Sequence, residues 1–308
     1  MHSFLSIGDI TQEEMHRLFD SAHLFRQSIK ARKSLDSLRN REVGLLFEKP
    51  STRTRTSFEV ATERLGGNAV YLPSSELQLS RGEPVKDTAR ILGGYLDVIV
   101  ARVFLHHTVE ELAKWGKVPV INGLSDLEHP TQIVCDFFTI REARGKVEGL
   151  KLAFIGDGNN VCHSLLLGGA LVGMDISVAC PDGYRPDPGV LDRALREAKK
   201  TGAVIEVVRD PGDAVTGADI LYTDVWVSMG EEKEREKRLR DFAGYQINRE
   251  LLDKAGSAAQ VMHCLPAHRG LEITDEMIEG PRSLVWAQGE NKLYGAAAVL
   301  DAAAHLQE

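Results

Sequence analysis

Residues 43–65 read VGLLFEKPSTRTRTSFEVATERL, an apolar run followed by a polar turn and then an amphipathic stretch. The apolar run at 43–47 predicts a buried strand, and Phe58, Ala61 and Leu65 recur at helical spacing. The turn between them is rich in hydroxyl and guanidinium groups, and it lies where the predicted helix begins. Because N–H groups and the positive end of the helix dipole meet there, the sequence predicts an anion site in a strand–turn–helix unit.

An isolated Ser-Thr pair before a helix is more often an ordinary N-cap than a binding site. In this turn, however, five hydroxyl residues and two arginines lie within one short segment. They are Ser51, Thr52, Thr54, Thr56 and Ser57, with Arg53 and Arg55. An arginine adds a bidentate fork that matches phosphate oxygens. The turn is therefore the first candidate binding site, and its expected ligand carries a phosphate.

The same alternation of short apolar runs and helical patterns extends in both directions from this unit. A capping box at Thr11 to Glu14 opens an amphipathic helix. Strand-like runs are expected at 43–47, 69–72, 98–103, 118–121, 152–155, 176–179, 204–208, 220–222 and 261–262. Strands that alternate with helices are typical of α/β proteins with parallel sheets. We therefore expect an α/β fold with two domains, each with a central parallel sheet flanked by helices.

The length of 308 residues fits two domains of ordinary size. A brief polar, glycine-containing stretch at 144–149 predicts the boundary, with domains over residues 1–145 and 146–308. An alanine-rich segment at about 290–308 has apolar residues on one face, which predicts a last helix that packs back on the first domain. The charged segment EEKEREKRLR at 231–240 indicates a solvated helix with i,i+4 ion pairs.

The composition excludes several classes of protein. Hydrophobic residues make up 43% of the chain and charged residues 27%, as in soluble globular proteins. The net charge of −8, without a long single-sign block, argues against nucleic-acid binding. There is no apolar run near the roughly 18 residues that a membrane span needs and no secretory signal, so a cytoplasmic protein is expected. The four cysteines lack C-x-x-C spacing, which argues against disulfides and a zinc knuckle.

The motif STRTRTSFE at 51–59 resembles the carbamoyl phosphate signature of the aspartate and ornithine carbamoyltransferase family. Three further segments agree with that family in the expected order: HPTQ at 129–132, DVWVSMG at 224–230 and HCLP at 263–266. The Ser-Met-Gly and HCLP segments are those of the ornithine enzymes. The resemblance implies transfer of a carbamoyl group from carbamoyl phosphate to the δ-amine of ornithine, giving citrulline and phosphate without cofactor or metal. Whether the reaction serves arginine biosynthesis or degradation stays open.

The resemblance also implies roles for individual residues. The implied contacts of carbamoyl phosphate are Ser51, Thr52, Arg53, Thr54, Gln78, Arg102, His129, Gln132, Cys264, Leu265 and Lys292. The implied contacts of ornithine are Asn160, Asp224, Ser228 and Met229. The implied catalytic residues are Arg102, His129, Asp224 and Cys264. Fixed donors would form an oxyanion hole for the carbamoyl oxygen, and the thiol and carboxylate would favour loss of a proton from the ornithine amine.

Two positions depart from the family pattern. Lys292 stands where the ornithine enzymes usually carry an arginine, and a lysine keeps the charge but lacks the fork, which leaves weaker carbamoyl phosphate binding open. Ser80 replaces an expected glycine in the loop at 78–86, which carries Gln78. In similar enzymes this loop reaches into a neighbouring subunit's site, so the resemblance implies a homotrimer or a higher assembly of trimers.

Several alternatives remain on the residues alone. One is a carbamoyltransferase for acetylornithine, putrescine or aspartate, and another is a non-catalytic protein that has kept the anion pocket. The GDG at 156–158 suggests a nicotinamide-dependent oxidoreductase, but Val161 stands where G-x-G-x-x-G needs its third glycine. Cys162, His163 and His268 raise the question of zinc, but their spacings fit no closed set of four ligands.

Overall fold

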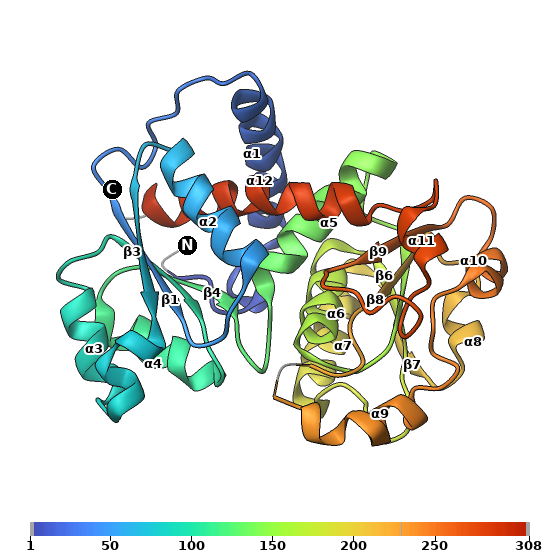
Figure 1. Ribbon diagram of the computed structural model, residues 1–308. Coiled ribbons are helices and arrows are strands. Elements are labelled where there is room, and N and C mark those ends of the chain that lie inside the picture. The colour runs from blue at the N-terminus through green and yellow to red at the C-terminus, as the bar shows by residue number, and fades with distance from the viewer. Residues whose placement is uncertain (1–2, 229, 306–308) are drawn as a thin grey trace. The chain divides into compact units, whose positions relative to one another are not determined.

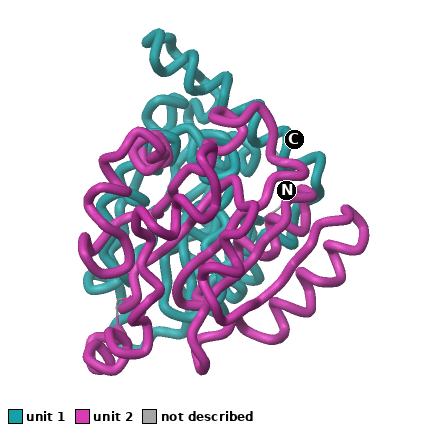
Figure 2. The backbone as a smooth tube through the Cα atoms, turned by 90° about the vertical axis from the view of Figure 1, so that its right-hand side faces the viewer, with its two compact units in different colours: residues 1–138, 290–308 teal, residues 139–289 magenta. Residues whose placement is uncertain are grey.

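The computed structural model describes residues 3–228 and 230–305. The chain folds into two compact units, which Figure 2 shows in different colours. Unit 1 comprises residues 1–138 and 290–308, and unit 2 comprises residues 139–289. Each unit is built around one parallel sheet with helices beside it (Figure 1), which confirms the predicted α/β fold class.

Unit 1 contains a four-stranded parallel sheet in the order β2-β1-β3-β4. Its strands are β1 (Glu42–Phe47), β2 (Asn68–Pro73), β3 (Val98–Arg102) and β4 (Val120–Leu124). Every residue of β3 is buried, which is why the sequence of this central strand is almost wholly apolar. The chain runs from β1 outward to β2 and then returns to β3 on the other side, so the strand order reverses between β1 and β3. Ligands of open α/β sheets bind at the carboxyl ends of strands at such a point.

The helices of unit 1 follow the predicted pattern. The α-helices are α1 (Gln12–Lys30), α2 (Thr52–Arg64), α3 (Val85–Leu92), α4 (His106–Gly116), α5 (Pro130–Arg144, which ends in unit 2) and α12 (Val285–Ala304, which begins in unit 2), and the 3-10 helices are η1 (Ile7–Asp9), η2 (Ser74–Glu76) and η3 (Gln78–Arg81). The predicted capping box is present, because Thr11 accepts from the Glu14 backbone N–H and the Glu14 side chain from that of Thr11. Helix α12 lies beside α1, where Lys30 and Glu290 pair at 2.8 Å (Figure 1). The C-terminal helix thus packs on the first domain, as predicted.

Unit 2 contains a five-stranded parallel sheet in the order β7-β6-β5-β8-β9. Its strands are β5 (Lys151–Ile155), β6 (Asp175–Ala179), β7 (Ile205–Val208), β8 (Ile220–Thr223) and β9 (Gln260–His263). Its helices are α6 (Asn160–Val172), α7 (Pro188–Thr201), α8 (Pro211–Val215), η4 (Glu232–Glu234), α9 (Arg235–Asp241), α10 (Arg249–Ala255) and α11 (Asp275–Glu279). Here the strand order reverses between β5 and β8, so the loops that follow these strands are the expected ligand-binding loops.

The segment at 231–240 differs from the solvated helix that its charges predict. It forms the short helices η4 and α9, and the Arg238 side chain within it is only 8% exposed. Its guanidinium pairs with Asp157 and Glu231 at 2.7 and 2.6 Å. The predicted solvation is therefore wrong for Arg238, because a buried cation needs partners close to it. The predicted i,i+4 pairing is present, since Arg238 also pairs with Glu234 at 3.4 Å.

The structure also describes the helix lengths and the surroundings of the cysteines. None of the described helices combines the length and apolar character that a membrane span requires. All four cysteines are buried and none of them forms a disulfide: Cys135, Cys162, Cys180 and Cys264. Burial raises the pKa of the Cys135 thiol to about 12. Cys135 therefore behaves as a small apolar core residue at neutral pH.

Candidate active site

The hydroxyl-rich turn forms the start of helix α2, as the sequence predicts. Ser51 is the N-cap, and its side chain accepts a hydrogen bond from the Thr54 backbone N–H at 3.2 Å. Thr52 is exposed, Arg53 is half-buried and Thr54 is buried. The helix follows directly on β1, so its first turn lies at the carboxyl end of the sheet where strand order reverses. The geometry is that of an anion site at a helix N-terminus.

The two arginines of this turn have different surroundings. Arg55 pairs with Glu59 at 3.3 Å, and its guanidinium carbon lies 3.5 Å from the centre of the Tyr71 ring. Residues two positions apart on a helix point to nearly opposite sides, since each residue is rotated by about 100° around the helix axis. The Arg55 side chain thus contacts the surface of its own helix and the neighbouring strand β2. Arg53 faces the other way and is the phosphate candidate.

Arg102 and His129 lie at the same edge of the sheet in unit 1. Arg102 is the last residue of β3 and is paired in register with Phe47, the last residue of β1. His129 immediately precedes helix α5 and is buried. Burial lowers the pKa of His129 well below its usual 6.5, and the nearby charges of Lys292 and Arg102 lower it further. The imidazole is therefore neutral at neutral pH and can act as a hydrogen-bond donor without carrying charge.

Lys292 reaches the same cluster from helix α12. Its ammonium donates a hydrogen bond to the side-chain oxygen of Gln132, and the Gln132 amide nitrogen donates to Asp136 at 2.8 Å. These two bonds fix which end of the amide carries oxygen. The lysine thus supplies charge beside His129 and also orients Gln132, which sequence reasoning did not foresee.

A buried carboxylate that the sequence did not single out supports the turn before His129. The Ser6 hydroxyl donates to Glu128 at 2.5 Å, and the Ile7 backbone N–H donates to the other carboxylate oxygen at 3.0 Å. The N-terminal segment is thereby joined to the residue next to His129. No local pattern signals this bond, because its partners are more than a hundred positions apart in the sequence.

The lowered pKa of His129 predicts a specific pH dependence of stability. Below about pH 6.5 the unfolded chain takes up a proton at this residue and the folded chain does not, so folded stability is lost as the pH falls. The loss amounts to about 1.4 kcal/mol per pH unit until the folded pKa is reached. His129→Asn should therefore lose its disadvantage relative to the natural protein as the pH falls from 6.5 to 5 in urea unfolding followed by circular dichroism. A difference that is constant over this range would contradict the prediction.

Among the described residues, the Gln78 side chain forms no hydrogen bond with the other predicted site residues of unit 1. It begins the 3-10 helix η3 and is exposed. Helix η3 ends at Gly82, which has a φ of +93° in the left-handed region that glycine adopts readily.

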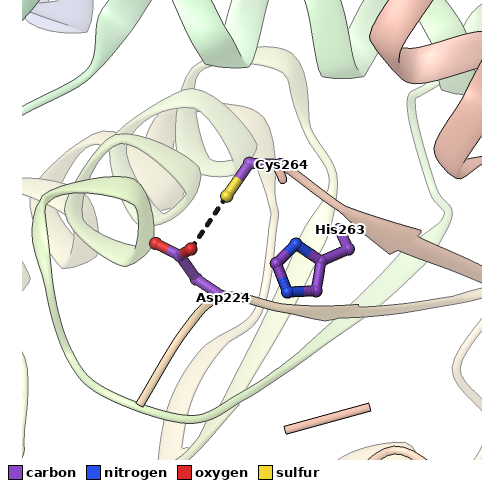
Figure 3. A group of neighbouring side chains, drawn as sticks. All are labelled: Asp224, His263 and Cys264. Atoms are coloured by element: carbon purple, nitrogen blue, oxygen red, sulfur yellow. Dashed lines mark hydrogen bonds between the residues drawn. The ribbon is translucent and has the colours of Figure 1, made fainter. Parts of the chain in front are cut away.

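In unit 2, Asp224 and Cys264 face each other (Figure 3). Asp224 follows β8 and Cys264 follows β9, and these strands are neighbours in the sheet. The Cys264 thiol donates to one Asp224 carboxylate oxygen at 3.0 Å. The Val225 backbone N–H donates to the same oxygen at 2.8 Å. Both side chains are largely buried, so the sequence-predicted pair forms a preorganised thiol–carboxylate site.

The other oxygen of Asp224 accepts a hydrogen bond from Asn159 at 2.9 Å. Asn159 is also the N-cap of helix α6 and accepts from the backbone N–H groups of Val161 and Cys162. Asn160, which the resemblance implies as an ornithine contact, is the first residue of that helix and is half-buried. The sequence did not indicate Asn159 as a site residue, although an asparagine before a helix is a common N-cap and could have been recognised as one.

Close packing explains why the GDG turn carries glycines. A Cβ on Gly158 would lie 2.3 Å from the backbone nitrogen of Pro186, which only a residue without a side chain avoids. Gly156 has a φ of +147° and packs near Thr223 and Asp224. Close packing of the turn against neighbouring loops therefore accounts for these glycines without a dinucleotide.

The segment after Asp224 is held by Arg238. The Ser228 backbone N–H donates to one oxygen of Glu231 at 2.9 Å, and Arg238 donates to the other at 2.6 Å. Arg238 also holds Asp157, whose pKa is raised to about 6 because burial outweighs the hydrogen bond from Arg238. Met229 lies outside the described residues.

The HCLP segment brings His263 and Leu265 beside Cys264. Leu265 has a φ of +57°, an unusual value that costs a residue with a side chain about 1 kcal/mol. Ligand atoms of Asp224, His263 and Cys264 lie within 4.8 Å of one another, a spacing that could hold a metal ion. Both ring nitrogens of His263 are already engaged, however, with Leu265 and with Glu272. The Asp224 carboxylate and the Cys264 thiol are also bonded to each other, so in this conformation the three residues offer a metal no closed set of four ligands.

Two parallel-sheet units, one with a hydroxyl-rich helix start and one with a thiol–carboxylate pair, define the architecture of the two-domain carbamoyltransferases. The chain belongs to the aspartate/ornithine carbamoyltransferase family. Residues 2–142 match the family model of the carbamoyl-P binding domain, and residues 148–303 match that of the Asp/Orn binding domain.

Similar proteins cover nearly the whole chain. An ornithine carbamoyltransferase of Methanosarcina acetivorans is 53% identical over 96% of this chain and 97% of its own length. The crystal structure of the Gloeobacter violaceus ornithine carbamoyltransferase covers 98% of both chains at 48% identity and a TM-score of 0.88. The structure of the Pyrococcus furiosus enzyme covers 97% of this chain and 96% of that one at 47% identity and a TM-score of 0.94.

Proposed function

We propose that this protein transfers the carbamoyl group of carbamoyl phosphate to the δ-amino group of L-ornithine, giving L-citrulline and phosphate. The observation that carries the proposal is the buried Asp224–Cys264 pair, in a chain whose other unit begins helix α2 with the STRTR turn. The pair suits a cationic amine, and the turn suits an acyl phosphate. Relatives named ornithine carbamoyltransferase, one of them anabolic, support this reaction and a place in arginine biosynthesis.

In the proposed reaction, unit 1 holds carbamoyl phosphate. The amides and hydroxyls at the start of α2, together with Arg53, bind the phosphate oxygens. Thr54, Arg102 and the neutral His129 donate hydrogen bonds to the carbamoyl oxygen, on which negative charge develops during attack. Each donor of this kind contributes about 3 kcal/mol to the stabilisation of a developing oxyanion in comparable sites.

Unit 2 prepares the nucleophile. The ornithine amine arrives protonated, and the Asp224 carboxylate with the Cys264 thiol binds this ammonium and favours transfer of its proton. Asn160, Ser228 and Met229 are the proposed contacts of the rest of ornithine. The free amine forms the new C–N bond at the carbamoyl carbon. The second proton of the attacking nitrogen then passes to the departing phosphate oxygen as the C–O bond to phosphate breaks. The charge of the leaving phosphate is met by Arg53 and the helix terminus.

The remaining contacts concern the carbamoyl NH2 and the assembly. We propose that the Leu265 carbonyl and the side chain of Gln132, oriented by Lys292, accept from the carbamoyl NH2. We also propose a cytoplasmic homotrimer in which the exposed Gln78 of one subunit contacts carbamoyl phosphate in a neighbour. The exposure of Gln78 supports its contact with a neighbour, and four cysteines without a disulfide support a cytoplasmic location.

The choice of acceptor tests the function directly. The purified protein should form a ureido product from carbamoyl phosphate and ornithine, with kcat/KM at least about a hundredfold higher than for acetylornithine, putrescine or aspartate. We expect this preference because a competing acceptor would leave a buried carboxylate or another polar group of the site without its partner. Such an unpaired group costs several kcal/mol in a desolvated site. Equal rates with putrescine would refute the assignment to ornithine, and no phosphate release with any acceptor would refute catalysis.

A further inference from the structure

Both ring nitrogens of His263 are engaged with groups that hold the segment after β9. The Leu265 backbone N–H donates to Nδ1 at 2.8 Å, and Nε2 lies 3.1 Å from a carboxylate oxygen of Glu272. A nitrogen that accepts a hydrogen bond carries no proton. The neutral ring must therefore be protonated on Nε2, and that proton is donated to Glu272.

The histidine and the glutamate are both fully buried. The same Glu272 oxygen also accepts from the His268 backbone N–H, which fixes the carboxylate against the loop that carries it. Because burial strengthens the bond between ring and carboxylate, the ring has one stable orientation and one stable tautomer. By fixing the ring, Glu272 thus also fixes the position of the group that is hydrogen-bonded to the opposite ring nitrogen, Nδ1.

The group on the opposite side is the backbone around Cys264. The His263 backbone N–H is held by the Gln288 side chain at 3.0 Å, and the Leu265 N–H is held by the His263 ring. Cys264 lies between these two fixed points, with its sulfur directed to Asp224. Leu265 has a φ of +57°, so its peptide group needs such support to stay in this orientation.

We propose that His263 is a positioning residue for carbamoyl transfer. Its Nδ1 holds the Leu265 backbone, and thereby the Leu265 carbonyl and the Cys264 thiol, while Glu272 selects the tautomer that makes this possible. This inference rests on the proposed function, in which that carbonyl and that thiol meet the two substrates. His263 itself touches neither substrate and takes no part in proton transfer.

A matched pair of variants separates positioning from packing. In His263→Asn the amide oxygen lies near the place of Nδ1, so the Leu265 bond is kept and the Glu272 bond is lost. In His263→Gln the amide reaches towards Glu272, so that bond is kept and the Leu265 bond is lost. We expect kcat of His263→Asn to exceed that of His263→Gln by about tenfold or more, because small displacements of reacting groups cost large factors in rate. KM for ornithine should change less than kcat and stay within about threefold of the natural protein in both variants, since the proposed contacts Asn160, Asp224 and Ser228 are not held by His263.

Thermal unfolding supplies the control for this comparison. If the buried His263–Glu272 pair served packing alone, His263→Gln would have both the higher Tm and the higher kcat. An order of kcat that follows the order of Tm, or equal kcat values, would overturn the proposal. Should His263→Gln fail to fold, Glu272→Leu serves instead, because it removes the acceptor for Nε2–H and should lower kcat about tenfold at unchanged KM for ornithine. An unchanged kcat in Glu272→Leu would equally overturn the proposal.

A second measurement does not depend on catalysis. In the protein labelled with ¹⁵N-histidine, the imidazole signals that disappear in His263→Asn belong to His263. We expect a protonated Nε2 and an unprotonated Nδ1, and the reverse tautomer would overturn the proposal. Failure of the proposed function would show differently, as a natural protein that forms no citrulline but retains this tautomer.

Discussion

Replacing Arg53 with alanine should lower kcat/KM for carbamoyl phosphate by about two to three orders of magnitude. The charge-assisted fork to phosphate is lost, and with it part of the stabilisation of the leaving group. Helix α2 should persist, because its N-cap bond from Thr54 to Ser51 does not involve the arginine. The measurement is citrulline formation over a range of carbamoyl phosphate concentrations at saturating ornithine.

Arg55 provides the matched control, since it lies two positions further along the same helix. Its partners are Glu59 and the Tyr71 ring, so Arg55→Ala should remove surface packing and leave kcat/KM within about threefold. Citrulline formation by Arg53→Ala that equals the natural rate at low carbamoyl phosphate would refute the phosphate site. Equal losses in the two variants would show that the effect comes from the helix and not from the anion contact.

The fold could be predicted because its signals are local. The strand β1, the cap at Ser51 and the capping box at Thr11 each follow from residues within a few positions of one another. The buried strands of a parallel sheet also give continuous apolar runs that are easy to recognise. The sequence could therefore predict the order of the elements as well as the helix start that we propose as the anion site.

Supporting contacts could not be predicted, because their partners are distant in the sequence. Glu128 meets Ser6, Asn159 meets Asp224, and Glu272 meets His263 only after the chain has folded. The local pattern was also misleading at Arg238, because its charged neighbours suggested a solvated helix whereas its side chain is buried and also bonds to Asp157 on another loop. Sequence motifs thus indicated the candidate reactive side chains. The side chains that orient them could be recognised only from contacts in the folded structure.

These two kinds of residue also differ in what their loss should do. Asp224 is held by Asn159, Cys264 and the Val225 backbone, so its carboxylate is fixed before any substrate arrives. Such prior fixation reduces the reorganisation needed during reaction. Substitution of the holding residues should weaken catalysis in part, whereas substitution of the carboxylate should remove the charge that binds the second substrate in the proposed reaction.

Asp224→Asn should therefore lower kcat/KM for ornithine by about a thousandfold, while KM for carbamoyl phosphate stays within about threefold. The amide keeps the size and most hydrogen bonds of the carboxylate, but it cannot attract the ammonium or accept its proton. The variant then depends on amine that is already neutral in solution. Because an alkylamine has a pKa of about 10.4, that fraction rises about tenfold per pH unit near neutrality.

The rate of Asp224→Asn at low ornithine should accordingly climb with a slope near one in a plot of log rate against pH, where the natural protein rises less steeply. Asp192→Asn is the control, because Asp192 is an exposed carboxylate on helix α7 of the same unit and should leave the rate unchanged within about twofold. A parallel pH profile for Asp224→Asn and the natural protein would mean that the carboxylate only binds ornithine. In that case the proton would have to leave through Cys264 or directly to the departing phosphate.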